Sequence, residues 1–457
     1  MATVAGLAKQ AGHNVEGSDA NLYPPMSTLL EDLEIPVYTP YQGSNIEGKS
    51  VDLFIVANVL SRGHEELEAA INTGIPYTSF PDFVGRYILK NRAPVVVTGT
   101  HGKTTTTSLI AHVLTELGEE PGYLIGGQPK NLERGFHLGN GQAFAIEGDE
   151  YDTAFFDKNS KFLHYRPSFV VFNNLEFDHA DIFGSLDDIK RQFDSLFYMI
   201  DDKHKIIANV DDDGVRSFLR DLDILDDVTT VSTSGQYPEA DYVVSDIRTN
   251  PNWSFEIRHD GQTFRYETKL TGHYNIANIS QVVATVNELA KANVIQKRQP
   301  SDIAQSVSSF RGVKRRLDLI VKKNGIEIYE DFAHHPTAVA NVIDGFKKSY
   351  PNKRLFVAFE PKNATSRRNL FINDYSRSFQ NADKVLIGQC PEDKRIVEAD
   401  RMNTEKLAGL IGSKAEAYPT NELLADSLAA TLRPNDAVIF MSSGSFSGIQ
   451  YSLIDTI

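Results

Sequence analysis

Cysteine is almost absent from this sequence, which has one, Cys390, in 457 residues. A single cysteine excludes an internal disulfide and a cysteine-rich zinc cluster, and it fits a reducing cytoplasm. Long apolar runs are missing as well. None reaches the roughly 18 residues of a membrane-spanning helix, and the N-terminus shows no signal-peptide core. We therefore expect a cytoplasmic protein that does not insert into a membrane.

Positive charge is also scarce, because 46 lysines and arginines face 61 aspartates and glutamates, for a net charge of -15. This balance argues against a nucleic-acid partner or an anionic membrane, since both require a basic face. A small anionic substrate would need a local positive site. The composition is otherwise ordinary for a globular enzyme, at 41% hydrophobic and 23% charged residues. The length predicts two to four domains.

Strand-like and helix-like stretches alternate along the chain, a pattern typical of an α/β fold with parallel sheets. Near the N-terminus the pattern predicts helices at 2–10 and 64–74, a short strand that ends near Asp19, and strands at 51–58 and 75–79. The chain begins inside a helix, whereas a doubly wound nucleotide-binding domain opens with a strand and a glycine-rich turn. We expect that this first strand and its glycine loop are missing here.

Two further units follow. A strand at 93–99 opens the second unit, in which residues 240–270 alternate like an antiparallel excursion with Asp260-Gly261 as a hairpin turn. A helix is expected at 273–290. The strands expected in the third unit lie within 326–336, 353–361, 383–389 and 436–448. The predicted domains are 1–90, 91–312 and 313–457.

The segment Gly99-Thr100-His101-Gly102-Lys103-Thr104 resembles a phosphate loop with compressed spacing. The usual loop needs a glycine where Val97 stands. Glycines still let backbone N–H groups approach phosphates, and a following helix N-terminus favours negative charge. Lys103 could reach the β and γ oxygens, and the Thr104 hydroxyl could ligate Mg²⁺. The alternative is a glycine turn with a solvated lysine, but four successive threonines are poor helix formers and favour a nucleotide site.

Polar clusters stand where two predicted strands end, which is where ligands bind in open parallel sheets. The first contains Glu147, Asp149, Glu150 and Asp152, and the second contains Asn173, Asn174, Asp178, His179 and Asp181. A carboxylate and an imidazole from neighbouring strand ends could hold Mg²⁺, which prefers oxygen ligands. The alternative is that these are acidic loop residues without a ligand and that His179 is a structural hydrogen-bonding residue.

Three other patches have both a functional and a structural interpretation. Asn275 and Asn278, one helical turn apart, could read an adenine edge or form an N-cap and a polar face. Arg315 and Arg316 could clamp a phosphate or belong to a solvated linker. The third patch, Asp331, His334 and His335, follows a predicted strand.

The order of these motifs resembles the Mur ligases, the ATP-dependent amide-forming enzymes of peptidoglycan synthesis. The resemblance covers essentially the whole chain. It implies an N-terminal Rossmann-like domain for a UDP-sugar, a central P-loop ATPase domain whose mostly parallel sheet has a small antiparallel part, and a C-terminal Rossmann-like domain for the incoming amine or peptide. ATP and Mg²⁺ are the implied cofactors.

The resemblance also implies roles for particular residues. The implied ATP-binding residues are Gly99, Thr100, Gly102, Lys103, Thr104, Thr105, Asn275, Asn278, Arg316 and Asp331. The implied catalytic residues are Lys103, Glu147, His179, Arg316 and His334, and the implied Mg²⁺ ligands are Thr104, Glu147 and His179. Asp19 and Asn21 would bind the uridine end of the sugar nucleotide, and Lys362, Arg367 and Arg368 would bind peptide carboxylates.

Within the family the chain is most similar to the members that join UDP-N-acetylmuramate to the tripeptide L-alanyl-γ-D-glutamyl-meso-diaminopimelate in peptidoglycan recycling. The segments that carry this likeness are 17–30, 147–167, 173–183, 330–338, 359–366 and 441–448. Phe193 and Asp194 stand where several relatives have a carbamylated lysine, which matches the subgroup that acts on UDP-N-acetylmuramate itself. The alternatives are a UDP-N-acetylmuramate–L-alanine ligase, a P-loop phosphotransferase and a nucleotide-gated binding protein. The sequence does not indicate an oligomeric state.

Overall fold

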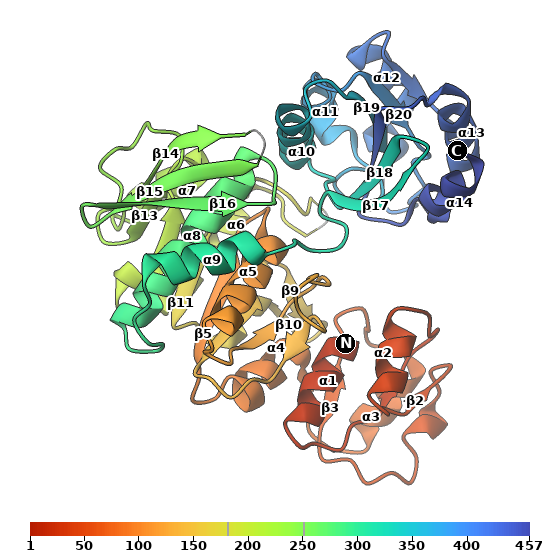
Figure 1. Cartoon of the computed structure of the whole chain (residues 1–457). Helices are drawn as coiled ribbons and strands as arrows, with labels where there is room; N and C mark the ends of the chain where they lie inside the picture. Colours follow the sequence, from red (N-terminus) through yellow and green to blue (C-terminus); the bar gives the residue numbers. More distant parts are fainter. Residues whose placement is uncertain (181, 250–251) are drawn as a thin grey trace.

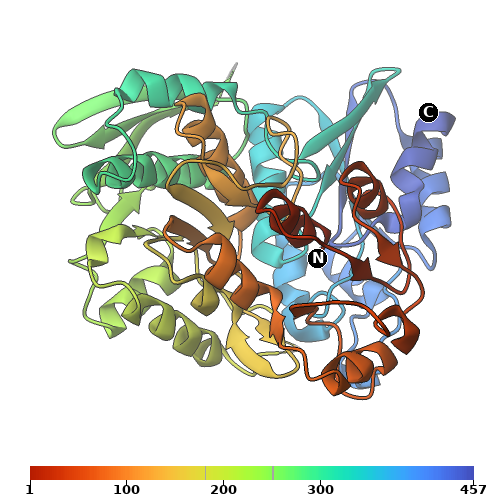
Figure 2. The ribbon, with the colours of Figure 1, turned by 90° about the horizontal axis from the view of Figure 1, so that it is seen from below.

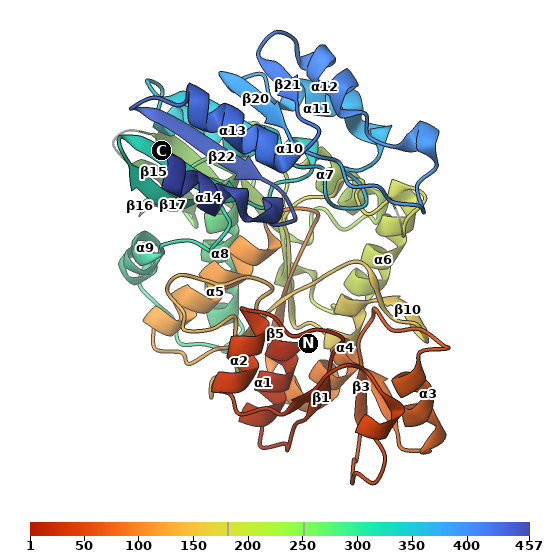
Figure 3. The same ribbon diagram turned by 90° about the vertical axis from the view of Figure 1, so that its right-hand side faces the viewer.

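The computed structural model describes residues 1–180, 182–249 and 252–457 and shows a three-domain α/β fold (Figure 1). In Figure 3 the N-terminal and C-terminal domains lie at opposite ends of the view, with the central domain between them. Seen from below, the N-terminal segments lie in front of the other two domains (Figure 2). Asp181, from the second polar cluster, lies outside the described residues.

The N-terminal domain consists of short elements. They are α1 (Ala2–Gln10), β1 (Gly17–Ser18), α2 (Met26–Asp32), β2 (Val37–Tyr38), β3 (Phe54–Val56), α3 (Glu65–Asn72), β4 (Tyr77–Ser79) and α4 (Phe80–Phe83). Strands β1 and β2 pair in parallel, and β3 and β4 pair in parallel in a separate sheet. The two helices and three strands predicted in this region are confirmed, although the strands are shorter than expected.

The central domain is built on one large mixed sheet. Its strands are β5 (Ala93–Thr98), β6 (Gly122–Leu124), β7 (Phe136–His137), β8 (Ala143–Glu147), β11 (Phe169–Phe172), β12 (Ile206–Asn209), β13 (Thr229–Ser232), β14 (Tyr242–Arg248), β15 (Trp253–His259) and β16 (Gln262–Thr268). Their order is β16-β15-β14-β13-β12-β11-β5-β8-β6-β7. Neighbouring strands pair in parallel through the middle of the sheet, which consists of β14, β13, β12, β11, β5, β8 and β6. The edge strands β7, β15 and β16 pair antiparallel.

The mostly parallel sheet with an antiparallel part is therefore confirmed. The predicted hairpin turn is confirmed too, because Asp260 and Gly261 connect β15 to β16 with φ of 48° and 72°. A small antiparallel pair, β9 (Asp152–Ala154) and β10 (Asp157–Ser160), lies apart from the large sheet.

Helices cover both faces of the central sheet. They are α5 (Lys103–Glu116), α6 (Leu186–Tyr198), α7 (Asp213–Asp221), α8 (His273–Lys291) and α9 (Pro300–Ser309). Successive side chains of a strand point to opposite faces, so Val95 and Val97 of β5 enter the core with α5, α8 and α9. Val96 enters the opposite core with α1, α6 and α7. The N-terminal helix α1 is thus anchored on the central domain.

The C-terminal domain has a six-stranded, mostly parallel sheet in the order β17-β18-β22-β19-β20-β21, in which only β17 pairs antiparallel among the described strands. The strands are β17 (Asp318–Lys323), β18 (Ile326–Asp331), β19 (Arg354–Phe359), β20 (Lys384–Ile387), β21 (Ala415–Ala417) and β22 (Asp436–Met441). The helices are α10 (Pro336–Ser349), α11 (Ile372–Ser378), α12 (Thr404–Ile411), α13 (Asn421–Thr431) and α14 (Ile449–Thr456).

All four strands predicted in this part of the chain are confirmed as β18, β19, β20 and β22. The domain boundaries predicted near 90 and 312 stay predictions; β5 begins at Ala93 and α9 ends at Ser309. Among the described helices, none combines the length and the apolar character that crossing a membrane requires.

Candidate active site

The loop between β5 and α5 is held in shape by the segment that follows β11. Gly99 and Gly102 adopt φ of 123° and 82°, and a Cβ on Gly99 would lie 2.8 Å from the Asn174 carbonyl oxygen. The backbone N–H of His101 donates to Asn174 Oδ1 at 2.7 Å, and Asn173 Nδ2 donates to the His101 carbonyl at 3.1 Å. Conformation and space therefore both require glycine at the first position.

The N-terminus of α5 is suited to an anion. Gly102 is its N-cap residue, no side chain in the described part of the chain caps it, and its first turn contains no acidic residue. The first N–H groups of a helix lack partners within the helix, and the helix dipole makes this end positive. A helix end of this kind at the carboxyl end of a buried strand fits a phosphate group.

Three charged side chains, Lys103, Glu150 and His179, form what we call the lysine cluster. Lys103 Nζ donates to the Gly99 carbonyl at 2.7 Å and lies 3.1 Å from Glu150 Oε2. Glu150 Oε1 lies 3.3 Å from His179 Nε2. Burial alone would lower the pKa of Lys103, but attraction by Glu150 and Asp149 outweighs it and raises that pKa. Burial would raise the pKa of Glu150, but Lys103 and His179 lower it to about 2.

His179 therefore lies beside Glu150, whereas the sequence interpretation paired it with Glu147. Glu147 instead accepts a hydrogen bond from Thr104 Oγ1 at 2.9 Å. Burial and the nearby Asp149 raise the pKa of Glu147. The hydroxyl and the two carboxylates of Thr104, Glu147 and Glu150 all converge on the first turn of α5.

Arg316 reaches this turn from the segment between α9 and β17. Its Nη2 donates to Thr104 Oγ1 at 3.2 Å. Asp331 shapes the backbone around Arg316, because its carboxylate accepts from the N–H groups of Leu317 and Ala333, both at 2.6 Å. Burial raises the pKa of Asp331 despite the nearby Arg316. Asp331 thus positions the segment that carries Arg316.

Asp178 connects the central domain to the C-terminal domain. Thr365 Oγ1 donates to Asp178 Oδ1 at 2.6 Å, and His334 Nε2 lies 3.8 Å from Asp178 Oδ2. Burial would raise the pKa of Asp178, but His334 and His179 hold it well below its usual range. The Asp178 carboxylate therefore lies between His334 and His179, which belongs to the lysine cluster.

A second group at the same loop consists of His101, Glu176 and His335, which we call the histidine cluster. His335 Nδ1 lies 3.2 Å from His101 Nε2 and 3.3 Å from Glu176 Oε2. The remaining distance, from His101 Nε2 to Glu176 Oε2, is 3.7 Å. Burial and the neighbouring His101 lower the pKa of His335 to about 4, so this imidazole is neutral at physiological pH.

Asn275 and Asn278 are buried at the start of α8. Asn278 Nδ2 donates to Asn275 Oδ1 at 3.3 Å, and Asn275 Nδ2 donates to the Thr271 carbonyl at 2.8 Å. A Cβ on Gly102 would lie 2.8 Å from Asn278 Oδ1. The pair therefore packs beside the phosphate loop, and its contact with adenine stays a prediction.

The predicted sugar-nucleotide residues are exposed on the N-terminal domain. Asp19 Oδ1 accepts a hydrogen bond from the backbone N–H of Asn21 at 3.2 Å. Lys161 Nζ lies 3.1 Å from Asp149 Oδ2, beside the acidic segment after β8.

Of the residues predicted to bind the peptide, Arg367 lines a cavity of about 480 Å³ in the C-terminal domain. Its Nη2 lies 2.9 Å from Asp393 Oδ2 in the same lining. Arg368 Nε is buried and has no partner among the described residues. The stem of Lys362 packs on Gly444, where a Cβ would lie 2.7 Å from Lys362 Cγ. Both lie outside the lining of this cavity.

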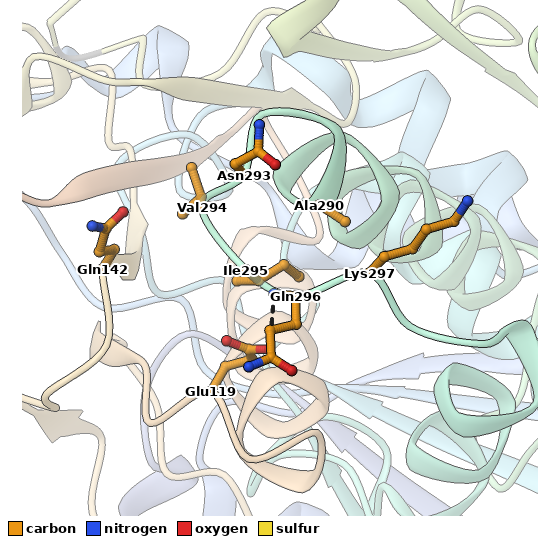
Figure 4. Close-up of a pocket in the computed structure, with 8 residues that line it drawn as sticks. All are labelled: Glu119, Gln142, Ala290, Asn293, Val294, Ile295, Gln296 and Lys297. Atoms are coloured by element: carbon orange, nitrogen blue, oxygen red, sulfur yellow. Dashed lines mark hydrogen bonds between the residues drawn. The ribbon is translucent and has the colours of Figure 1, made fainter.

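Another cavity, of about 580 Å³, opens at the far end of the central domain (Figure 4). It is lined by Glu119, Gln142 and residues 290 and 293–297, and the Gln296 N–H donates to Glu119 Oε1 at 3.2 Å. Glu119 follows the C-terminal end of α5, whereas Lys103 begins that helix. This cavity is therefore separate from the phosphate loop.

Comparison with known proteins assigns the family. Profiles described as "Mur ligase family, catalytic domain", "Mur ligase middle domain" and "Mur ligase, glutamate ligase domain" match residues 1–92, 97–286 and 315–444. The UDP-N-acetylmuramate–L-alanyl-γ-D-glutamyl-meso-2,6-diaminoheptandioate ligase of Escherichia coli K12 is 35% identical over 457 residues, which is 100% of this chain and 95% of that protein. The chain belongs to the Mur ligase family. It is an ATP-dependent amide ligase of peptidoglycan synthesis and recycling.

Two solved structures resemble the whole chain. The murein peptide ligase of Psychrobacter arcticus 273-4 is 31% identical with a TM-score of 0.71, covering 100% of this chain and 96% of that one. The UDP-N-acetylmuramate–alanine ligase of Thermotoga maritima has a TM-score of 0.78 with the same coverage, but at 20% identity it shows the fold alone.

Proposed function

We propose that this ligase joins UDP-N-acetylmuramate to L-alanyl-γ-D-glutamyl-meso-diaminopimelate and converts ATP to ADP and phosphate. The observation that carries the proposal is the identity with the E. coli ligase along the whole chain, because the name of that protein specifies both substrates. The geometry around the phosphate loop supports a phosphoryl transfer.

The reaction proceeds through an acyl phosphate. A lactoyl carboxylate oxygen of UDP-N-acetylmuramate attacks the γ-phosphorus of ATP, the bond to the bridging oxygen breaks, and ADP leaves. The alanyl amine of the peptide then attacks the acyl carbon, loses a proton and expels phosphate. A carboxylate is a poor electrophile, so phosphorylation supplies the leaving group. Catalysis of this kind depends on positioning and charge neutralisation.

The residues at the phosphate loop match those tasks. The uncapped N–H groups of α5 bind the phosphates. Lys103, already held toward the site by Glu150 and the Gly99 carbonyl, neutralises the γ-phosphoryl group. Arg316 adds a second positive charge from the segment that leads into the C-terminal domain, and its contact with Thr104 places it at the same helix turn.

Mg²⁺ fits the donor set at this turn, since it prefers hydroxyl and carboxylate oxygens. Thr104, Glu147 and Glu150 supply such oxygens, and His179 lies beside Glu150. When bound, the ion would neutralise phosphate charge. Glu150 thus joins Thr104, Glu147 and His179 as a proposed ligand.

The test is a choice between two amine substrates. Purified protein is given ATP, Mg²⁺ and UDP-N-acetylmuramate with either the tripeptide or L-alanine, and ADP release and product mass are measured. We expect kcat/KM for the tripeptide to exceed that for L-alanine by about 100-fold or more, since a site built for polar groups rejects a substrate that lacks them. A preference for L-alanine would contradict the proposal. A stable phosphorylated product without an amide would instead indicate a phosphotransferase.

A further inference from the structure

The histidine cluster brings together three ligand atoms from three separate segments. His101 belongs to the phosphate loop, Glu176 follows β11, and His335 precedes α10 in the C-terminal domain. The two imidazole nitrogens and the carboxylate oxygen all lie within 4.8 Å of one another. None of these three residues has a role in the amide-forming reaction described above.

The three distances in the cluster fit one geometry. Zinc binds histidine nitrogen and carboxylate oxygen at about 2.0–2.1 Å in a tetrahedron, which places neighbouring ligand atoms about 3.3–3.4 Å apart. The observed separations are 3.2, 3.3 and 3.7 Å. A hydrogen bond between two imidazoles explains one short distance, whereas a nearly equal triangle fits one face of a zinc tetrahedron. Two imidazoles and a carboxylate also suit Zn²⁺ better than Mg²⁺.

Two of the three ligands, Glu176 and His335, are held in place by neighbours outside the cluster. Thr337 Oγ1 donates to Glu176 Oε2 at 2.7 Å, and the backbone N–H of Glu176 donates to Thr100 Oγ1 at 2.9 Å. The ring of His335 is buried and meets Phe371 edge-on, with centroids 5.2 Å apart. Hydrogen bonds to ligating side chains orient them and increase metal affinity. Glu176 thus has a hydrogen bond and His335 a packed ring, while His335 Nε2 is buried without a hydrogen-bond partner among the described residues.

We propose that His101, Glu176 and His335 bind Zn²⁺ at a site separate from the one proposed for Mg²⁺ and ATP. Because His101 and His335 lie 234 positions apart and on different domains, the ion connects the phosphate loop to the C-terminal domain. This inference goes beyond the proposed function and does not depend on the identity of the amine substrate.

The direct test is anomalous scattering from crystals of the full chain. Metal-stripped protein is equilibrated with Zn²⁺ in the presence of excess Mg²⁺, crystallised, and measured at the zinc absorption edge. We expect a peak bounded by His101 Nε2, Glu176 Oε2 and His335 Nδ1. Peaks confined to the Glu150–His179 pair or to other places would overturn the proposal.

Variants test the same site in solution by zinc content and by competition with a chelator. His335→Gln is expected to lose one equivalent of zinc, while His334→Gln, which changes the adjacent histidine outside the triangle, keeps it. Glu176→Gln provides a second variant in case His335→Gln does not fold, as judged by circular dichroism. Folded His335→Gln or Glu176→Gln protein with the zinc content of the unaltered chain would refute the site. Because the readout is metal content, loss of ligase activity leaves the result interpretable.

Discussion

The two clusters on either side of Gly102 share one loop but differ in charge. The lysine cluster pairs a buried ammonium with a buried carboxylate, and the Glu150 side chain is only 4% exposed. The histidine cluster contains no ammonium, and the Glu176 side chain is 27% exposed. A carboxylate as buried as Glu150 needs a strong positive partner, whereas Glu176 is partly exposed to solvent and neighbours two imidazoles.

The loop positions on the two sides of Gly102 therefore offer different sets of potential ligands. Lys103, after Gly102, begins α5 and faces the acidic residues that follow β8. His101, before Gly102, faces Glu176 and the C-terminal domain. The first side suits phosphate with a hard cation, and the second suits a cation that prefers nitrogen ligands.

Replacing the lysine should have the largest effect. Lys103→Ala removes the charge that neutralises the γ-phosphoryl group and leaves Glu150 with His179 as its remaining partner, so we expect kcat to fall by about 1000-fold. ADP release is the measurement. Lys190→Ala, which breaks an exposed ion pair with Asp221, should leave the rate within about twofold because such pairs contribute little. A rate for Lys103→Ala within about tenfold of the unaltered protein would rule out this role.

Variants of Glu147 and Glu150 distinguish between two possible sets of Mg²⁺ ligands. Glu150→Gln removes the carboxylate beside His179, so we expect the Mg²⁺ concentration for half-maximal activity to rise about 10- to 100-fold. Glu147→Gln should have a smaller effect, because Glu147 is the partner of Thr104. Titrating Mg²⁺ against ADP release measures both. A larger effect of Glu147→Gln than of Glu150→Gln would instead support Glu147 and His179 as the Mg²⁺ ligands.

A milder change tests the hydrogen bond from Thr337 that holds Glu176 in the histidine cluster. Thr337→Val removes the hydrogen bond to Glu176 with little change in shape, so we expect zinc affinity to fall about tenfold. Chelator competition gives the dissociation constant. Thr337→Ser, which keeps the hydroxyl, is the matched control, and equal weakening in both variants would show that the hydroxyl is not the cause.

The smallest effect concerns Asp178, which contacts His179 on one side and Thr365 on the other. Thr365→Val removes a hydrogen bond worth about 1 kcal/mol, and we expect kcat to fall about fivefold through looser docking of the C-terminal domain. Steady-state kinetics with saturating substrates measure it. Thr365→Ser should restore most of the rate, and an unchanged rate in Thr365→Val would show that this contact does not position the domain.

Much of the fold could be predicted because apolar runs and turn residues act locally. Val95 to Val97 form a buried strand, and Asp260-Gly261 forms a tight hairpin with positive φ at both positions. The positions of the N-terminal strands could be predicted but their lengths could not, since β1 and β3 have few partner strands that would extend them.

The site was harder to predict because loops and domain contacts decide it. Strand β8 ends at Glu147, so strand alternation does not say whether Glu147 or Glu150 faces His179. The contacts of Asp178 with Thr365 and of His101 with His335 join residues 187 and 234 positions apart. All of these residues belong to motifs that the sequence shows, Thr365 included in the segment 359–366, but their pairing required the folded chain.

The central claim, phosphorylation of a carboxylate at this loop, is tested most directly by an oxygen-isotope transfer. UDP-N-acetylmuramate labelled with heavy oxygen in its lactoyl carboxylate is converted with ATP and the tripeptide, and the released phosphate is analysed by mass spectrometry. An acyl phosphate predicts one labelled oxygen in each phosphate formed with the amide. Phosphate free of label, despite amide formation, would contradict the account.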